Sequence, residues 1–420
     1  MAVATHGDDG GRSLSAAVVR HPPAEPAWAG APRLHWIDWL RVAAIAGVFV
    51  YHSLRPFDAE GWHVKNAETS GDLNGLMALF WSFGLAVLFL LSGAGARFAL
   101  RRRSWPTFLR ERTTRLLVPF VAGTVLLSPL QAFIEATHKG TYAGSFFGYV
   151  GVWAGGLVDR LGGILSPTFS GVGYHLWFLG FLFAMSVLAL PLFEWLLGRP
   201  GRQLVDALAR SVARPGSTIA FALPIALLMT GGVLLGTDEH DWFEFAWYSG
   251  YFLIGFLFFS DERFTAAIRR DLRPALGVAL ASAFLLIATP VGGLLATMDQ
   301  GLDLPHVLVG IVFAIEGWAS TLVVLNIGLR TARLQQPVSP GVGDAVLPLY
   351  VIHQPVILAV AFFVVQWPLG ILPKWIVVFG VSLAVTLALV RLGLRLPVTR
   401  VLLGARARPA TAARPATAAR

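Results

Sequence analysis

The stretch HWIDWLRVAAIAGVFVYHSL, residues 35–54, carries an arginine and a histidine inside an apolar run long enough to cross a bilayer. Arg41 and His52 are eleven residues apart, which on an α-helix is about three turns plus ~20°. Both side chains therefore project from one face of the helix, about 16 Å apart along its axis. Because ionisable groups are costly in hydrocarbon, both are candidates for function.

Composition places the rest of the chain in the same environment. Of its 420 residues, 55% are hydrophobic and only 14% are charged, which is too little charge for the surface of a soluble protein of this length. Cysteine is absent, which excludes disulfides, thiolate–metal sites and a cysteine nucleophile.

Ten apolar segments have the length of a membrane span. We therefore predict an all-α integral membrane protein, a bundle of ten transmembrane helices. Segment 145–166 contains Asp159 and Arg160 and is rich in glycine, so it is expected to be an interfacial or re-entrant element. The ten expected spans are 36–54, 75–96, 115–135, 175–197, 217–236, 243–260, 275–297, 306–329, 345–366 and 373–393.

The distribution of basic residues supports this count. With both termini in the cytoplasm, most of the 33 lysines and arginines fall on the cytoplasmic side, as the positive-inside rule requires. The net charge of +9 therefore indicates topology and contact with anionic lipids, and does not indicate nucleic-acid binding. The five basic residues left outside are Arg55, Lys65, Lys139, Arg160 and Lys374.

Three regions follow from this pattern. Residues 1–33 are rich in alanine, glycine and proline, lack the apolar core of a signal peptide, and are expected to form a disordered cytoplasmic tail. Residues 34–395 are expected to form the membrane domain. Residues 396–420 contain RPATAA twice and are expected to be a basic, low-complexity cytoplasmic tail.

Basic side chains gather at the expected cytoplasmic surface. Arg112 and Arg115 are three residues apart at the mouth of the third span, and two guanidiniums on one helix face can grip a phosphate. Together with Arg41 they would form a cytoplasmic anion pocket. The alternatives are that the pair merely marks the inner surface, and that Arg41 pairs structurally with Asp38.

The remaining candidates are polar groups inside or beside spans. His52 suits proton transfer, and its alternative is an interfacial histidine bonded to a carbonyl. His175 with Trp177, His353 and the buried Glu316 are candidates for binding the acceptor or orienting a histidine. Each has an equally simple structural explanation, which for His353 is a bond to a carbonyl freed by the nearby proline. The histidines lack metal-ligand spacing, so no metal is expected.

These residues stand in motifs that resemble the bacterial acyltransferase-3 family of integral-membrane O-acyltransferases. The similarity covers about residues 34–395, and the family's usual span count is also ten. The Trp-rich opening and the Tyr–x–x–His–Gln–Pro ending resemble the branch that includes periplasmic-glucan succinyltransferases. The motifs, in chain order, are WIDWLRVAAIAGVFVYHS (36–53) with its Arg–x10–His, FLLSGAGARFALRRR (89–103), FLRERTTRLLVP (108–119), YHLWFLGFLF (174–183) and LPLYVIHQPVI (347–357).

The resemblance implies a mechanism. Acyl-CoA, carrying an acetyl or succinyl group, would place its phosphates on Arg41, Arg112 and Arg115 from the cytoplasm. His52 would then act as a base or as a transient acyl carrier. The acceptor would be a hydroxyl of an envelope glycan or lipid, and the location would be the bacterial inner membrane.

Partners implied are acyl-CoA, the glycan or lipid acceptor and membrane lipids, with no bound cofactor and no nucleic acid. Whether the protein is a homo-oligomer is left open. The rival function is a secondary transporter or flippase for a glycan or lipid-linked substrate. Such folds often contain internal repeats, and Arg–x10–His has no counterpart in the last five spans.

Overall fold

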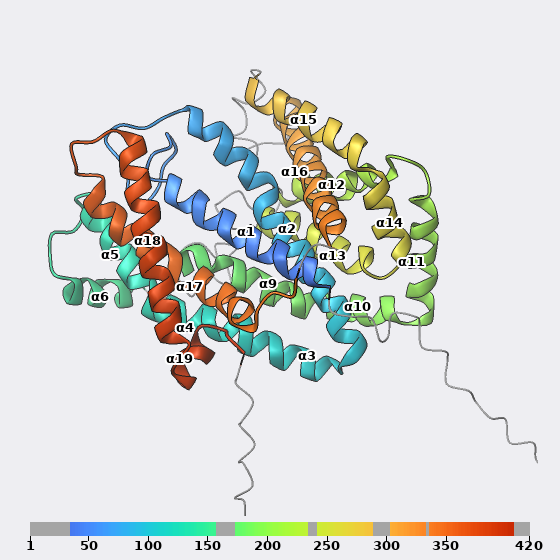
Figure 1. The fold of residues 1–420 in the computed structure, drawn as a ribbon, viewed down its shortest axis with the longest axis horizontal. Helices are drawn as coiled ribbons and strands as arrows, with labels where there is room; N and C mark the ends of the chain where they lie inside the picture. Colours follow the sequence, from blue (N-terminus) through green and yellow to red (C-terminus); the bar gives the residue numbers. More distant parts are fainter. Residues whose placement is uncertain (1–33, 157–172, 234–241, 289–302, 333–335, 407–420) are drawn as a thin grey trace, which may run out of the picture. The chain divides into compact units, whose positions relative to one another are not determined.

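A computed structural model describes residues 34–156, 173–233, 242–288, 303–332 and 336–406. Within these ranges every regular element is a helix, and the β-structure is limited to one isolated bridge between Asp58 and Ser70. The elements are α1 (His35–Leu54), α2 (Asp72–Arg102), α3 (Trp105–Arg112), η1 (Thr113–Leu117), α4 (Val118–Leu126), α5 (Ser128–His138), α6 (Phe146–Gly155), η2 (Tyr174–Leu176), α9 (Trp177–Leu188), α10 (Leu190–Leu197), α11 (Arg199–Ser211), η3 (Ser217–Phe221), α12 (Ala222–Val233), α13 (Trp242–Phe258), α14 (Glu262–Arg270), α15 (Leu272–Ala288), α16 (Leu304–Thr331), α17 (Pro340–Val364), α18 (Ile371–Gly393) and α19 (Pro397–Leu402) (Figure 1).

The all-α prediction is confirmed, and each of the ten expected spans falls on helix in the described ranges. Five single helices are long and apolar enough to cross a membrane, and up to eight spans result if each bent helix pair counts as one. The five are α1, α2, α16, α17 and α18. The count of ten spans and the side on which the termini lie remain predictions.

Proline explains three breaks between consecutive helices. Two of them fall inside the expected spans 115–135 and 175–197, and the third, between Arg270 and Leu272, precedes the expected span 275–297. The helix pairs α4–α5, α9–α10 and α14–α15 bend by 41°, 49° and 64° at their junctions. Pro129, Pro191 and Pro274 lie in the first turns of α5, α10 and α15. Proline lacks an N–H and restricts the residue before it, so it starts a new helix more readily than it continues the old one.

Segment 145–166 is described only in its first half. Residues Phe146–Gly155 form the ten-residue helix α6, which is too short to cross a bilayer. Ser145 caps this helix by accepting a hydrogen bond from the backbone N–H of Gly148 at 3.2 Å. Residues 157–172 lie outside the described ranges, so the expected re-entrant path stays a prediction.

Glycines let the helices at the centre of the bundle approach closely. A Cβ added at Gly93 of α2 would lie 1.9 Å from the carbonyl oxygen of Phe252, and one added at Gly255 of α13 would lie 2.0 Å from that of Leu90. The two backbones therefore touch at reciprocal glycines, the small-residue packing common between membrane helices. α1 packs against α2, α16, α17 and α18, so it lies within the bundle.

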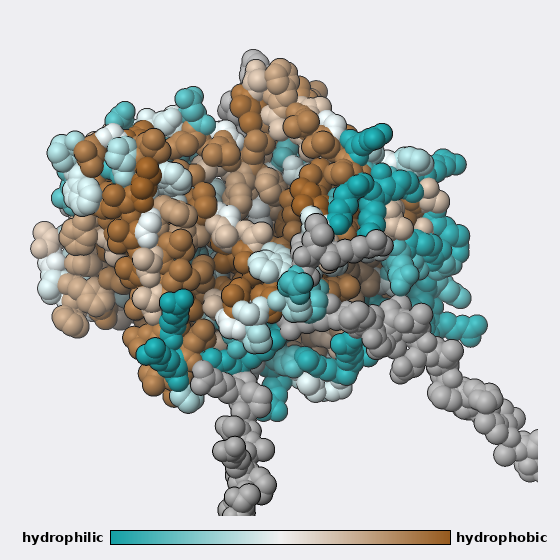
Figure 2. Space-filling view, in the orientation of Figure 1, coloured by the Kyte–Doolittle hydropathy of each residue, from teal (hydrophilic) through white to brown (hydrophobic). Residues whose placement is uncertain are grey.

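The exposed surface divides by polarity. α18 carries a row of exposed aliphatic side chains that includes Leu372, Ile376 and Leu392, and this face is brown in Figure 2. Polar side chains gather over α11 and α14, which are short and basic. An apolar flank with polar ends is the surface expected of a protein embedded in lipid.

Candidate active site

Two histidines predicted from separate motifs meet inside the bundle. His353 Nε2, on α17, lies 3.2 Å from His52 Nδ1, near the end of α1. The ring centroids are 5.0 Å apart and the planes are inclined at 64°. His353 is 1% exposed, and His52 is half-buried. The structure thus brings together residues 301 positions apart in the chain.

The surrounding carbonyls determine where the ring protons lie. His52 Nδ1 is 3.0 Å from the carbonyl oxygen of Val48, and His353 Nδ1 is 2.5 Å from that of Tyr350. A carbonyl only accepts hydrogen bonds, so each Nδ1 must carry the proton. His353 Nε2 is then an acceptor that shares the His52 Nδ1–H with Val48. In the neutral ring of His52 this leaves Nε2 with a lone pair, as a base or nucleophile requires.

His175 is held against the same pair by a proline. Pro355 lies inside α17 and has no N–H, so the carbonyl of Val351, four residues earlier, loses its helical donor. His175 Nε2–H donates to that carbonyl at 3.1 Å. His175 is therefore the hydrogen-bond donor to the carbonyl that Pro355 frees. From the sequence alone, His353 was the residue considered for this bond.

The bond from His175 leaves its other nitrogen unused. Nδ1 of His175 is buried and has no hydrogen-bond partner among the described residues. The ring lies 5.1 Å, centroid to centroid, from that of His353. The hydroxyl of Tyr350 donates to the His175 carbonyl oxygen, so two bonds tie η2 to α17. Tyr174 precedes His175 with φ of 51°, a conformation that non-glycine residues rarely adopt.

The loop after α1 covers the His52 end of this site. The ring centroid of Trp62 is 6.4 Å from that of His52, and Trp62 also contacts His63 at 5.4 Å. His63 Nδ1 lies 2.7 Å from a carboxylate oxygen of Glu135, and its ring lies 5.0 Å from that of Tyr174. Aromatic and carboxylate groups thus surround the histidines on the side expected to face outward.

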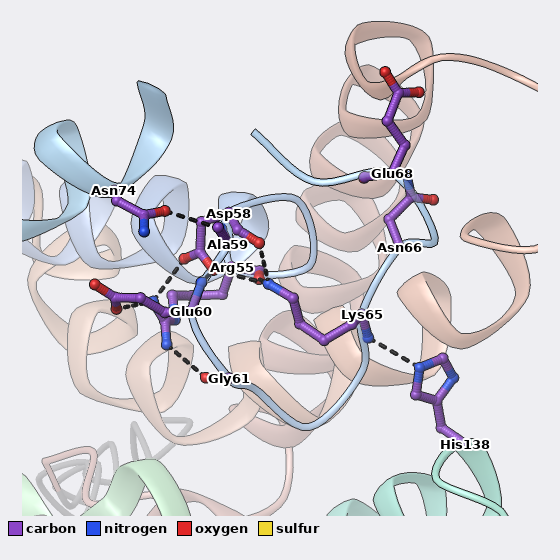
Figure 3. Close-up of polar contacts among 10 residues, drawn as sticks. All are labelled: Arg55, Asp58, Ala59, Glu60, Gly61, Lys65, Asn66, Glu68, Asn74 and His138. Carbon is purple, nitrogen blue, oxygen red and sulfur yellow. Dashed lines mark hydrogen bonds and ion pairs between the residues drawn. The ribbon is translucent and has the colours of Figure 1, made fainter. Parts of the chain in front are cut away.

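A network of ion pairs holds this loop in place (Figure 3). Arg55 contacts the carboxylates of Asp58 at 2.6 Å and Glu60 at 2.8 Å, and Lys65 Nζ contacts Asp58 at 2.8 Å. Asp58 is fully buried, and its two cations balance the charge that burial would otherwise destabilise. Burial lowers the pKa of Lys65, and the Asp58 carboxylate opposes that effect. The backbone N–H of Lys65 donates to His138 Nε2 at 3.0 Å, which joins the loop to α5.

Further bonds connect the loop and the end of α1 to the first turns of α18. Lys374 Nζ, which is buried, donates to Asn66 Oδ1 at 2.7 Å and to the Val365 carbonyl at 2.9 Å. Trp375 Nε1 donates to Ser53 Oγ at 3.0 Å. The external basic residues expected from topology are thus engaged in bonds wherever the structure describes them, while Arg160 lies outside the described ranges.

The three predicted arginines also come together, at the other end of α1. Arg41 Nη2 donates to the carbonyl of Leu91 at 2.9 Å, and Arg112 Nη2 to that of Ser92 at 3.4 Å. Gly95 leaves room for the Arg41 guanidinium, because a Cβ at position 95 would lie 3.2 Å from Arg41 Nη2. Arg112 interacts electrostatically with both Arg41 and Arg115. The Ser–Gly motif of α2 therefore provides carbonyls and space for the guanidiniums.

The helix that carries Arg112 and Arg115 is not a regular α-helix. Residues Thr113–Leu117 form the π-helical turn η1, and the Arg112 guanidinium lies 4.9 Å above the ring of Phe108. π-turns inside α-helices occur frequently at functional sites. The simple argument that a spacing of three places both arginines on one α-helical face therefore does not hold, although both side chains reach the Arg41 region.

Three other predicted residues have mainly structural contacts. Asp38 forms an ion pair with Arg41 at 3.2 Å. Trp177 is buried in an aromatic cluster, 5.7 Å from Tyr248. Glu316 accepts hydrogen bonds from Ser82 and, at 2.6 Å, from Ser320. The described ranges contain no group of His, Asp and Glu side chains arranged to hold a metal.

The bundle contains several helices that are long and apolar enough to cross a membrane, as in a multi-pass membrane protein, and it has a histidine pair at one end of α1 and arginines at the other. A family model described as acyltransferase domain matches residues 34–391. The chain therefore belongs to the acyltransferase-3 family and is a membrane acyltransferase. No curated protein and no solved structure was found to match it.

Sequence reasoning missed the contacts that arise from folding. Trp62 and Tyr350 were not singled out, although both now contact the histidines. The spacing of Val351 and Pro355 was the available signal, since a proline always frees the carbonyl four residues earlier in a helix. No comparable signal marked Trp62, because its position depends on the ion pairs of the loop.

Proposed function

We propose that the protein transfers an acetyl or succinyl group from cytoplasmic acyl-CoA to a hydroxyl of an envelope glycan or lipid in the bacterial inner membrane. The reaction is O-acylation, and His52 provides the reacting nitrogen. The observation that carries the proposal is the bond between His52 and His353, which leaves Nε2 of His52 unprotonated.

In the first route, His52 acts as a general base. Nε2 removes the proton of the acceptor hydroxyl as its oxygen attacks the thioester carbon, so a C–O bond forms and the C–S bond breaks. The imidazolium then returns the proton to the departing thiolate of coenzyme A. Removal of such a base typically costs 10²- to 10⁴-fold in rate.

In the second route, His52 carries the acyl group. Nε2 attacks the thioester carbon, so a C–N bond forms, the C–S bond breaks and coenzyme A departs as its thiolate. The acceptor hydroxyl then attacks the acyl-imidazole, a C–O bond forms as the C–N bond breaks, and the hydroxyl proton passes to the freed Nε2 and from there to the thiolate. Both routes use the same nitrogen and the same protonation of Nδ1. His353 is a positioning residue in each, because it accepts the Nδ1–H of His52 at 3.2 Å and helps to fix the ring.

The donor's phosphates bind to Arg41, Arg112 and Arg115. These guanidiniums are partly buried and crowd one another, and an anion between them relieves their repulsion. From Arg41 the rise of α1 to His52 is about 16 Å. That is the scale of a pantetheine arm, so the thioester reaches the histidine while the nucleotide stays at the arginines.

The experiment is acyl transfer by the purified protein in nanodiscs. Radiolabelled acetyl-CoA or succinyl-CoA is supplied with envelope glycans, and both coenzyme A release and label transfer are followed. His52→Ala is expected to lose at least about 100-fold in turnover. His306→Ala, on the first turn of α16 and outside the histidine cluster, is the matched control and is expected to retain turnover.

Coenzyme A release without any acceptor separates the routes. The acyl-histidine route predicts a burst of coenzyme A equal to the enzyme concentration, and this burst disappears in His52→Ala. The base route predicts no burst, although the enzyme is active once acceptor is added. Full turnover by His52→Ala would refute both. The alternative of a transporter or flippase is not favoured by the family, and it predicts no turnover with any donor.

A further inference from the structure

The segment that follows α18 returns to the arginine cluster. α19 packs against α4, and Gly404 and Ala405 are buried. We call residues 397–406 the C-terminal strap. It lies beyond residue 391, where the match to the acyltransferase domain ends, and within the region that the sequence marked only as a basic tail.

One end of the strap is anchored by a buried ion pair. Arg400 is 7% exposed, and its Nη2 lies 2.9 Å from a carboxylate oxygen of Asp344 on α17. The same guanidinium donates to the carbonyl of Arg406 at 2.7 Å, and to that of Leu394 at 3.2 Å. Arg400 therefore does not face the cluster itself. It fixes the backbone from which the Arg406 side chain extends.

At its other end, the backbone of the strap at Gly404 packs closely against η1, which carries Arg115. Gly404 has φ of 71°, and a Cβ there would lie 2.6 Å from Leu347 and 2.9 Å from the Arg115 carbonyl. Arg115 Nε donates to the Gly404 carbonyl at 3.4 Å. Only glycine satisfies both the left-handed conformation and this space. The strap is thus built onto the arginine cluster.

This construction places a fourth cation where three already repel one another. Arg406 is exposed, and its charge acts on Arg115 together with that of Arg41. Two carboxylates act on Arg115, and both are engaged by other arginines. Asp344 pairs with Arg400, and Glu111 pairs with Arg103. Holding a guanidinium against like charges is unfavourable unless an anion lies between them, and a phosphate-rich anion accepts bonds from several guanidiniums at once.

We propose that Arg406 is a fourth phosphate-binding residue for the acyl-CoA donor, and that the C-terminal strap positions it beside Arg115 at the edge of the arginine cluster. The inference rests on the proposed function and extends it, because it assigns a binding role to a segment outside the family match. The ligand class is an organic polyphosphate, which the nucleotide part of coenzyme A supplies. An anionic lipid headgroup carries the same chemistry, and the experiment separates the two sources.

The test measures coenzyme A affinity of the full chain in nanodiscs of zwitterionic lipid. Arg406→Ala is expected to raise the dissociation constant about 5- to 10-fold, the effect of one exposed charge-assisted contact. Arg406→Lys keeps the charge but loses the planar guanidinium that can donate two parallel hydrogen bonds, so its dissociation constant is expected to lie between those of wild type and Arg406→Ala. Arg391→Ala removes an equal charge from the exposed end of α18 and is expected to change affinity less than about 2-fold.

A second variant tests positioning. Asp344→Asn leaves all four arginines in place but weakens the anchor of Arg400, so it is expected to weaken coenzyme A binding and to make Arg406→Ala less costly in the double variant. Equal affinity of Arg406→Ala and wild type overturns the inference while leaving the proposed function intact. An effect of Arg406→Ala seen only when anionic lipid is present assigns Arg406 to a headgroup and also overturns it. Failure of the wild type to bind coenzyme A overturns the proposed donor and this inference together.

Discussion

Replacing His353 tests the proposal that His52 is the reacting histidine. His353→Leu removes the acceptor 3.2 Å from His52 Nδ1 while keeping a similar volume, and His52 retains its bond to Val48 at 3.0 Å. One neutral hydrogen bond contributes about 0.5–1.5 kcal/mol. We therefore expect turnover to fall roughly 2- to 13-fold, which is well short of the 10²- to 10⁴-fold expected for loss of a general base.

The assay is coenzyme A release at saturating donor and acceptor, with His353→Gln as the matched variant. Glutamine keeps an acceptor in the side chain, so it is expected to recover part of the loss. A purely structural effect would lower the melting temperature and the active fraction of both variants equally. A loss of 100-fold or more in His353→Leu, with unchanged melting temperature and KM, would refute the reasoning and make His353 the base.

Three further predictions concern stability, measured by thermal or denaturant unfolding in detergent. Gly93→Ala should destabilise the protein by about 1–3 kcal/mol because its Cβ meets backbone, whereas Gly380→Ala, with open space around it, should be neutral or slightly stabilising; equal effects would contradict the close contact of α2 and α13. Asp58→Asn should cost about 3–5 kcal/mol by uncoupling a buried ion pair, while Glu60→Gln, at a half-exposed carboxylate, should cost less than about 1 kcal/mol. Burial would raise the pKa of Asp271, but bonds from Arg270 and from the backbone of residues 216 and 218 outweigh it and hold the pKa below its usual value; its stabilisation should be present above the unfolded pKa near 4 and be lost as pH falls through the lower folded value, and Asp271→Asn should abolish that part of the pH dependence.

The helices and the two ends of the site were predictable from the sequence. Hydrophobic runs located the helical segments, and the helical repeat placed Arg41 and His52 on one face. These are local properties, set by the spacing of residues along one element. The approach of Arg112 to Arg41 was also expected. That expectation assumed a regular α-helix through Arg112 and Arg115, whereas the π-turn η1 changes the geometry of that helix.

The contacts between helices were not predictable in the same way. The pairing of His52 with His353 and of His175 with Val351 depends on how α1, η2 and α17 pack, which no spacing within a single segment encodes. The strap was hidden for another reason. Its last three residues, 404–406, are glycine, alanine and arginine, and they resemble the tail that follows. Only the left-handed conformation of Gly404 in the structure shows how this part fits against the bundle.

The continuity of α1 has a consequence for selectivity. Arg41 and His52 lie on one uninterrupted helix, so the distance between them is fixed and does not depend on how neighbouring helices move. In the proposed reaction this fixes the distance between the bound phosphates and the reacting nitrogen. This distance matches the pantetheine arm, which all acyl-CoA donors share. In that reaction, choice among acyl groups would be made beyond His52, on the side where Trp62 and the loop held by Asp58 lie. Exchange of that loop should alter which acyl group is moved and leave the reach of the donor unchanged.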